Sequence, residues 1–509
     1  MKKEFMRTGK VLLIYPSMGF SGNFVRHAPL SLLYASMDLV ARGVEVEFFD
    51  QRLYGENWRE PLSEVIKDGL LVAGISVMSG TPIKMGIELT AFLKQALPQV
   101  PVVWGGPHPT FYPETVFTIC PQVDYIVSGY GSRPFDLLVQ AIEENNPEPN
   151  FPGIYYQKDG QLVANPSEQV FEYVDYKKIP YHLIKDYSVY GQLESKQIIF
   201  SMYSAYGCPY KCTFCSSPAY LKGFKHRWEK VEAMEVVDHV EYVQKNFGAT
   251  YIYFIDDDSF VNLKHVETII DEISRRKIPV ELGFRGARVN EIKRMSDEFL
   301  DKLAAAGTDI MHIGAESGSN RILEILKKDC TVEDIIAVNQ KLARHGQIKA
   351  AYNFIMGVPG ETLEDMKKTR DLMLRLIKDN PSTMVFTPNK FRPLPGTELF
   401  EVAREQWDYK PPKTTEDWIT LEAEGDHYAP WFNKRMISFS KLLLLGSYFI
   451  DHKIFRVTKG DTGVYKFLRA ASWAYTPISN FRFRTGFDRF YIEYFFYQLG
   501  QRMSGLIFR

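Results

Sequence analysis

Three cysteines, Cys208, Cys212 and Cys215, lie within eight residues of the chain and are the side chains best suited to chemistry. Their C-x3-C-x2-C spacing falls on a loop marked by Gly207 and Pro209, so the three thiolates can point toward one centre. Thiolates are the usual protein ligands of iron–sulfur clusters, and three of them leave one iron of a four-iron cluster open to another ligand. The spacing therefore predicts a 4Fe-4S cluster with one open coordination position.

Two other uses of these thiols have to be weighed. A zinc site needs a fourth ligand and more often shows paired C-x2-C or histidine-containing spacings. Disulfide bonds are disfavoured because the chain has only five cysteines and no secretory start, which indicates a reducing, cytoplasmic location. Cys120 and Cys330 are isolated, and we expect them to be core residues or ordinary thiols.

The cysteine loop resembles the cluster-binding signature of radical S-adenosylmethionine (SAM) enzymes, with the aromatic Phe214 directly before the last cysteine. In that family the open iron chelates the amino and carboxylate groups of SAM, and an electron from the cluster releases a 5′-deoxyadenosyl radical. The resemblance implies SAM as a second cofactor, with Phe214 beside it. Relatives with a second four-iron cluster, such as methylthiotransferases, need further cysteine ligands, which this chain does not readily supply.

Strand and helix patterns alternate from the cysteine loop to about residue 400. The expected strands cover residues 198–203, 251–255, 280–284, 310–314, 350–356 and 384–387. Helices are expected over residues 229–247, 263–275, 297–306, 332–345 and 363–377. About six such units predict a partial parallel (β/α)6 barrel, whose chemistry lies at the carboxyl ends of the strands.

Polar residues and glycines gather at those strand ends. Each alone could be a solvated strand end or a helix cap. Together they resemble the SAM-binding part of a radical SAM barrel. That resemblance places Asp256 and Asp257 at the SAM amino group, Arg285 or Arg288 at its carboxylate, Glu316 at the ribose or methionyl end, and Gly357 and Gly360 at the adenine.

The region from about residue 10 to 145 also alternates strand and helix, which predicts a doubly wound, Rossmann-like parallel sheet. The expected strands are 11–15, 44–49, 71–77, 102–104 and 125–127, with helices over 29–42 and 83–97 among the connections. Such sheets bind ligands at the carboxyl ends of their strands. Two glycine pairs, Gly105-Gly106 and Gly129 with Gly131, follow the fourth and fifth strands and would allow close approach to the backbone.

With its place ahead of the barrel, this region resembles the cobalamin-binding domain of B12-dependent radical SAM enzymes; an empty structural domain is the alternative. The resemblance implies that cobalamin contacts Ser76, Met78, Ser79, Gly105, Gly106, His108, Gly129 and Gly131. Tyr130 and Ser132 stand where relatives usually carry acidic residues. The D-x-H-x-x-G motif is missing, so no histidine of this domain is expected to ligate cobalt from below.

Four regions follow from these patterns. They are a cobalamin-binding domain (1–145), a linker with a hairpin turning on Asp159-Gly160 (146–197), the barrel (198–400) and a helical C-terminal region (401–509).

From residue 431 onward, the chain has thirteen basic and only four acidic residues, with aromatics between them. This tail fits either a helical cap with a solvated basic face or a surface resting on anionic lipid headgroups. A net charge of -1 and the lack of an RNA-binding fold argue against nucleic acid, and the longest apolar run, 436–450, is too short to span a membrane.

The resemblance implies a cobalamin-dependent radical SAM enzyme that methylates an unactivated carbon of a small-molecule substrate. The alternative within this class is an oxidative cyclase resembling the anaerobic Mg-protoporphyrin monomethyl ester cyclase. A non-catalytic cobalamin- or SAM-binding module is the alternative from another class, and the complete set of cluster cysteines counts against it. The aromatic, basic tail points to a large apolar substrate, such as a tetrapyrrole or a polycyclic lipid. A ferredoxin or flavodoxin is the expected one-electron reductant.

Overall fold

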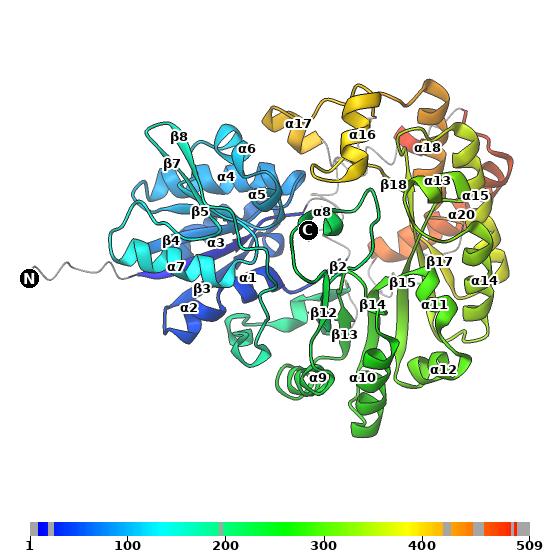
Figure 1. The fold of residues 1–509 in the computed structure, drawn as a ribbon, viewed down its shortest axis with the longest axis horizontal. Coiled ribbons are helices and arrows are strands. Elements are labelled where there is room, and N and C mark those ends of the chain that lie inside the picture. Colours follow the sequence, from blue (N-terminus) through cyan, green and yellow to red (C-terminus); the bar gives the residue numbers. More distant parts are fainter. Residues whose placement is uncertain are drawn as a thin grey trace, which may run out of the picture. The chain divides into compact units, whose positions relative to one another are not determined.

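The computed structural model describes residues 9–18, 25–192, 197–420, 429–450, 463–489 and 493–495, which form two compact units. The first unit contains residues 9–189 and 411–420, and the second contains residues 190–410 and 429–495 of the described chain. In Figure 1 the N-terminal part of the first unit runs from blue to cyan and its α17 segment is yellow-orange, whereas the second unit runs from green to red. The chain thus leaves the first unit near residue 189 and returns to it at residue 411.

The first unit is built on a seven-stranded sheet in the order β3-β1-β4-β5-β6-β7-β8. Its strands are β1 (Lys10–Tyr15), β3 (Val46–Asp50), β4 (Leu70–Ser76), β5 (Val102–Gly105), β6 (Tyr125–Val127), β7 (Ile154–Lys158) and β8 (Gln161–Ala164). The first five are parallel, as the sequence predicts. The hairpin on Asp159-Gly160 is present, but it extends the sheet instead of serving only as a connector, because β7 pairs with β6.

Both faces of this sheet are buried under helices, which explains why its strands are continuous apolar runs. Leu12 and Ile14 point to one core, and Val11 and Leu13 point to the other. One face carries α1 (Leu30–Ala35), α2 (Met37–Ala41) and α7 (Ser132–Glu143). The other carries α3 (Arg59–Ile66), α4 (Thr81–Ala96), α5 (Pro107–Phe111) and α6 (Pro113–Ile119).

Two details of the first unit differ from the sequence-based expectation. The single helix expected over 29–42 is divided at Ser36, whose hydroxyl donates to the carbonyl oxygen of Leu33 at 3.0 Å. The second detail is α17 (Thr415–Thr420), a helix from far along the chain that packs beside α4. Its Trp418 is only 2% exposed and belongs to the core formed with α3, α4 and α6.

The second unit is a partial barrel of six parallel strands in the order β10-β13-β14-β15-β16-β17. The strands are β10 (Ile199–Met202), β13 (Tyr251–Phe254), β14 (Glu281–Ala287), β15 (Thr308–Glu316), β16 (Lys349–Met356) and β17 (Thr383–Val385), and β18 (Asn389–Lys390) also pairs with β16. All six lie where the sequence predicts them.

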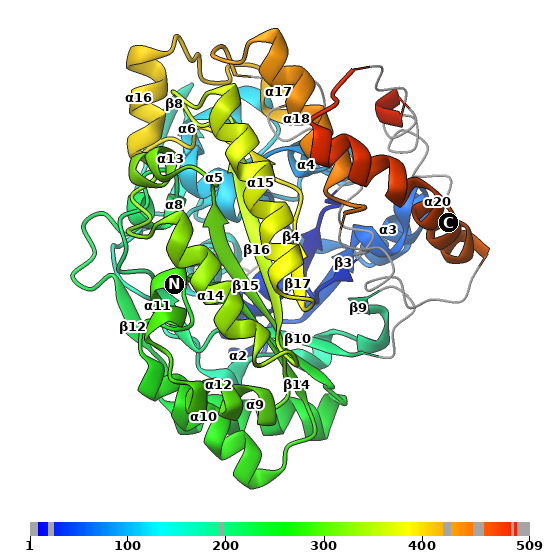
Figure 2. The ribbon, with the colours of Figure 1, turned by 90° about the vertical axis from the view of Figure 1, so that its right-hand side faces the viewer.

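Helices cover the outer side of this curved sheet (Figure 2). They are α9 (Ala233–Phe247), α10 (Leu263–Arg276), α12 (Asp297–Ala305), α14 (Val332–Ala343) and α15 (Leu363–Asp379). The helix expected from residue 229 begins at Ala233, because β12 (Trp228–Lys230) pairs with β11 (Ala205–Gly207) ahead of the cysteine loop.

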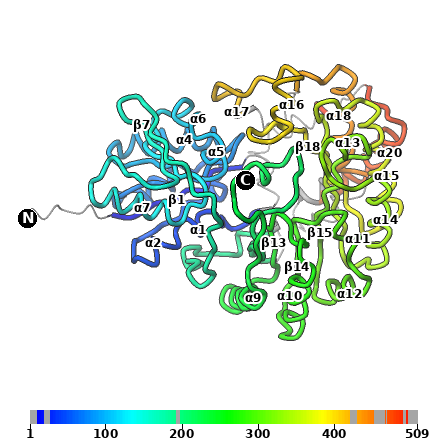
Figure 3. Tube along the Cα trace, viewed as in Figure 1, coloured from blue at the N-terminus to red at the C-terminus, as the bar shows by residue number. Residues whose placement is uncertain are grey.

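The C-terminal region is helical in its described parts, as expected. It contains α16 (Glu398–Gln406), α18 (Lys434–Gly446) and α20 (Gly463–Thr485), and α18 packs against both α15 and α20 (Figure 3). The aromatic run at 490–497 lies mostly outside the described residues. Of the helices described, none combines the length and the apolar character needed to cross a bilayer.

Candidate functional site

The three cysteines lie on the loop between β11 and α8 (Ser216–Tyr220), at the carboxyl end of the first barrel strand. Gly207 begins this loop with φ 74°, a backbone conformation that favours glycine. Cys212 is buried, Cys208 and Cys215 are half-buried, and none of the three forms a disulfide. Burial raises the pKa of Cys208 to about 12 and also raises that of Cys215, so these two thiols are protonated at neutral pH.

Two N–H donors already point at the sulfur atoms. Nη1 of Arg288 donates to Sγ of Cys212 at 2.9 Å, and the backbone N–H of Ser217 donates to Sγ of Cys215 at 3.4 Å. Hydrogen bonds to sulfur are one of the means by which proteins tune iron–sulfur clusters. Three thiols with cationic and backbone donors beside them fit a cluster, whose binding would displace the thiol protons.

No three His, Cys, Asp or Glu side chains of the described residues converge closely enough to hold a single metal ion. The ligands of a cluster need not do so, because each cysteine binds a different iron.

Arg288 is committed to the cysteine loop. Its guanidinium is buried, stacks over the ring of Tyr210 at 3.9 Å and donates to the carbonyl oxygen of Lys328 at 2.9 Å. Arg285, which lies on β14 three residues before Arg288, is exposed. Of the two arginines proposed for the SAM carboxylate, the geometry therefore favours Arg285.

The three aspartates that follow β13, Asp256 to Asp258, have different surroundings. Both carboxylate oxygens of Asp256 accept hydrogen bonds from Ser204, one from the backbone N–H and one from the hydroxyl, each at 2.7 Å, so this buried side chain fixes the turn before the cysteines. Burial raises the pKa of Asp256 to about 6. Asp258 is buried beside Glu291, which accepts the Tyr210 hydroxyl hydrogen at 2.5 Å. Asp257 alone of the three is exposed and can reach a ligand.

Glu316, the last residue of β15, forms a buried ion pair that the sequence did not reveal. Its carboxylate accepts from Nζ of Lys328 at 3.0 Å, and both side chains are almost fully buried. Glu316 has φ 60°, and the neighbours of Lys328, Lys327 and Asp329, have φ 52° and 54°. Strained non-glycine conformations of this kind cost of order 1–3 kcal/mol each and tend to cluster at functional sites. Lys328 is therefore a further candidate for the site, and sequence reasoning missed it because two lysines after a short helix look like ordinary helix-terminal cations.

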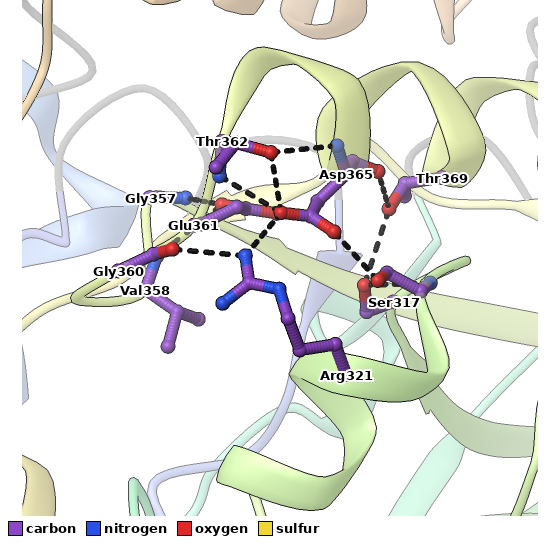
Figure 4. A network of polar contacts seen from close by, with 10 residues as sticks. Ser317, Arg321, Gly357, Val358, Gly360, Glu361, Thr362, Asp365 and Thr369 are labelled. Carbon is purple, nitrogen blue, oxygen red and sulfur yellow. Dashed lines mark hydrogen bonds and ion pairs between the residues drawn. The ribbon is translucent and has the colours of Figure 1, made fainter.

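A polar network ties the loop after β15 to the start of α15 (Figure 4). Asp365 accepts from the Ser319 and Thr362 hydroxyls, each at 2.6 Å, and from Arg321. Gly318 approaches α15 so closely that a Cβ there would clash with the backbone carbonyl oxygen of Lys368. The network thus holds the segment that follows Glu316 in one position.

Asp365 should make this network sensitive to acid. Burial alone would raise its pKa, but hydrogen bonds from Ser319, Thr362 and Arg321 lower it to about 2. A carboxyl whose folded pKa lies below its unfolded value stabilises the fold above pH ~4, and that stability is lost as the pH falls through ~2. Asp365→Asn should therefore lower the free energy of unfolding of this unit by about 2 kcal/mol at pH 7, and by about half of that near pH 3.

Urea unfolding at several pH values measures this deficit. Asp371→Asn, at an exposed position on the same helix, is the control and should change stability by less than ~0.5 kcal/mol. A deficit for Asp365→Asn that stays constant from pH 7 to pH 3 would contradict the assignment.

Gly357 and Gly360 follow β16 with φ 80° and 81°. Burial raises the pKa of Glu361 to about 8, although its carboxyl accepts from the backbone N–H of Gly357 and of Val358. Gly357 is also covered by an aromatic segment, since its carbonyl oxygen accepts from Nε1 of Trp431 at 2.8 Å. Phe214 of the cysteine loop packs against the apolar cluster that includes Val358.

The first unit contains a cavity of about 80 Å³ at the carboxyl ends of its strands. Five of the eight residues expected to contact cobalamin line it, namely Ser76, Gly105, Gly106, Gly129 and Gly131. Its remaining walls are mostly apolar and include Phe135. Gly105 and Gly131 do not have positive φ, and a Cβ at either would meet only ordinary contacts at 3.5 and 3.9 Å. Neither backbone conformation nor packing therefore requires glycine at positions 105 and 131. The absence of a side chain at these positions instead leaves the cavity open.

The other three expected contacts lie outside the cavity lining. His108 is buried, its Nδ1 lies 3.1 Å from the Ser79 hydroxyl, and its ring packs edge-on against Trp418 with centroids 4.9 Å apart. Burial lowers the pKa of His108 to about 3, so the ring is neutral. Met78 is partly exposed. His108 therefore packs on the core that contains Trp418 and does not line the cavity.

Comparison with known proteins assigns a family to each unit. Residues 202–373 match the radical SAM superfamily, and residues 25–139 match the B12 binding domain. An uncharacterised methyltransferase of Pyrococcus horikoshii is 28% identical over 303 residues, which cover 59% of this chain and 62%, less than two thirds, of that protein. The anaerobic magnesium-protoporphyrin IX monomethyl ester cyclase of Synechocystis is 24% identical over 392 residues, covering 75% of this chain and 76% of that protein.

The fold also matches a solved structure. The radical SAM methyltransferase TsrM from Kitasatospora setae, solved with cobalamin and a 4Fe-4S cluster bound, aligns with a TM-score of 0.64 at 22% identity and covers 78% of each chain. The two family matches fall on the two units that carry the glycine-lined cavity and the cysteine loop. The chain therefore combines a B12-binding domain with a domain of the radical SAM superfamily, and its cofactors are a 4Fe-4S cluster, S-adenosylmethionine and cobalamin.

Proposed function

We propose that this enzyme transfers a methyl group to an unactivated carbon of a large, mainly apolar small-molecule substrate. The observation that carries the proposal is the pairing, in one chain, of a cysteine loop supplied with N–H donors and a glycine-lined cavity that the fold keeps open. When bound, the cluster and SAM together supply a 5′-deoxyadenosyl radical, and cobalamin supplies the methyl group.

The protein's own side chains have separate tasks in this proposal. Cys208, Cys212 and Cys215 hold the cluster, and Arg288 offsets the negative charge of the thiolate that it contacts. Asp257 and Arg285, both exposed at the strand ends, bind the ammonium and carboxylate groups of SAM. The glycines at 105, 106, 129 and 131, with Ser76, line the cobalamin site.

A group of rings on and directly beyond the barrel strands supports an apolar substrate. His312 of β15 stacks on Phe386 at 5.3 Å and meets the edge of Tyr253 at 6.0 Å. Burial, with the nearby charge of Arg285, lowers the pKa of His312 to about 4, so this group is uncharged at neutral pH. A tetrapyrrole or a polycyclic lipid would suit such a surface, and a ferredoxin or flavodoxin would supply the electron.

Oxidative cyclisation is the second candidate, favoured by the alignment with the Synechocystis cyclase over three quarters of this chain. The two reactions differ in the product. The test is anaerobic purification with cobalamin, quantitation of iron, sulfide and corrinoid, and then incubation of candidate substrates with SAM that carries a deuterated methyl group. We expect about four irons and one cobalamin per chain and a product that gains the labelled methyl group. A product that has lost hydrogens without gaining the label would replace methylation by cyclisation.

A further inference from the structure

The C-terminal helix α20 buries its polar side and exposes its apolar side. Ser472, Thr476, Ser479 and Phe483 recur at helical spacing and are all buried. The Ser479 hydroxyl donates to the carbonyl oxygen of Gly446 on α18 at 3.1 Å, and the Phe483 ring lies against the same glycine. The buried side of α20 thus carries three hydroxyl groups and one aromatic ring, and two of these residues, Ser479 and Phe483, contact Gly446 of α18.

The opposite side of α20 carries large apolar side chains in water. Trp473 is 74% exposed, Phe481 is 60% exposed and Ile478 is 49% exposed. A helix that packs on a soluble core normally turns such residues inward. Large exposed apolar residues gathered on one side of a helix are typical of interaction surfaces. Figure 2 shows α20 running along the outside of the second unit.

The positive charge of α20 favours a negatively charged partner. The helix carries four basic residues and no Asp or Glu over its length of 23 residues. Lys466 and Arg484 are exposed, as is Arg489 just beyond the helix, whereas Arg482 is buried and paired with Glu493. The free charge on this surface is therefore positive, and it flanks the exposed apolar residues.

We infer that this face of α20, defined by Lys466, Trp473, Ile478, Phe481 and Arg484, docks the enzyme on an anionic lipid surface. Aromatic and aliphatic side chains between exposed Lys and Arg are the pattern of helices that lie in the membrane interface, with the apolar groups among the acyl chains and the cations at the headgroups. A second copy of the chain fits less well, because a two-fold pairing of this face would oppose its own cations. The helix is already held by α18, so binding requires little new ordering of its backbone.

This inference goes beyond the proposed methyl transfer and does not depend on it. Its test uses the full-length enzyme, purified with its cofactors, in co-sedimentation with vesicles of phosphatidylcholine alone or of phosphatidylcholine with one third phosphatidylglycerol. We expect binding to the anionic vesicles that weakens as salt rises from 50 to 500 mM, and little binding to the neutral ones.

Two variants separate the apolar and the electrostatic contributions. The double variant Trp473→Ser with Phe481→Ser should weaken binding to anionic vesicles at least about tenfold, because it removes two large apolar side chains. The double variant Lys466→Glu with Arg484→Glu should weaken binding by more than about tenfold, because each cation near the surface contributes about fivefold. Met234→Ser is the matched control, because Met234 on α9 is also exposed and lies on the same unit. It should bind like the wild type.

Other results would overturn the inference. Equal binding of wild type and both variants, binding to neutral and anionic vesicles alike, or no binding to either would do so. The inference would also fail if the serine variant changed only the oligomeric state in light scattering, because the face would then bind a second copy of the chain. It would fail equally if the variants lost only their reduction by flavodoxin, because the face would then bind an acidic electron donor.

Discussion

Replacing Cys208, Cys212 and Cys215 together by alanine should remove all iron and sulfide from the purified enzyme and abolish reductive cleavage of SAM. The three thiols are the cluster ligands in our proposal, and no other cysteine lies on their loop. Iron quantitation, the absorbance of the cluster near 400 nm and the yield of 5′-deoxyadenosine measure the effect. The expected loss of activity is complete, because without the cluster no electron reaches SAM.

Cys330→Ser provides the matched control for the cluster variant. Cys330 is half-buried and free, like two of the loop cysteines, but lies beyond Lys328 on another segment. This variant should retain about four irons and its activity. Iron retained by the triple variant, or lost from Cys330→Ser, would refute the assignment of the ligands.

Gly105→Val should lower cobalamin affinity by about 10- to 100-fold while the empty protein keeps its stability. A new Cβ at this position meets only an ordinary contact at 3.5 Å, and valine suits a strand. The added methyl groups would instead occupy part of the 80 Å³ cavity, and overpacking of this kind costs about 1–3 kcal/mol. Corrinoid content after purification and titration with cobalamin measure the loss.

The control for this change is Gly346→Val. Gly346 also lacks a positive φ and has only ordinary contacts, the nearest at 3.6 Å, but it belongs to the second unit and lines no cavity of the first. It should bind one cobalamin per chain. Full cobalamin content in Gly105→Val would show that the cofactor does not use this cavity.

The sequence was informative where one local rule determines the structure. The C-x3-C-x2-C spacing is complete in a single loop, and the strands of both sheets follow from apolar runs bounded by helical periods. Local reasoning also placed the glycines at 105, 106, 129 and 131 at strand ends, where they line one cavity.

Contacts between distant segments could not be predicted in this way. Asp256 reads as a strand-end carboxylate, yet its oxygens are occupied by Ser204, 52 residues earlier in the chain. Arg288 reads as a free cation, yet it reaches Cys212. Lys328 carries no signal of its pairing with Glu316, because that pairing depends on a left-handed backbone at both its neighbours.

The position of Trp418 bears on how this enzyme can be divided or recombined. Its indole is part of the first unit's core, although residues 190–410, which include all the barrel strands, lie between Trp418 and the N-terminal part of that unit in the sequence. A fragment ending at residue 189 would therefore lack a side chain whose removal from a core typically costs 3–5 kcal/mol. Exchanging the N-terminal region with that of a relative would also separate α17 from the partners it packs against. The two units are thus not interchangeable modules. A first unit that is transferred to another protein, in evolution or by design, must keep α17 from the C-terminal part of the chain.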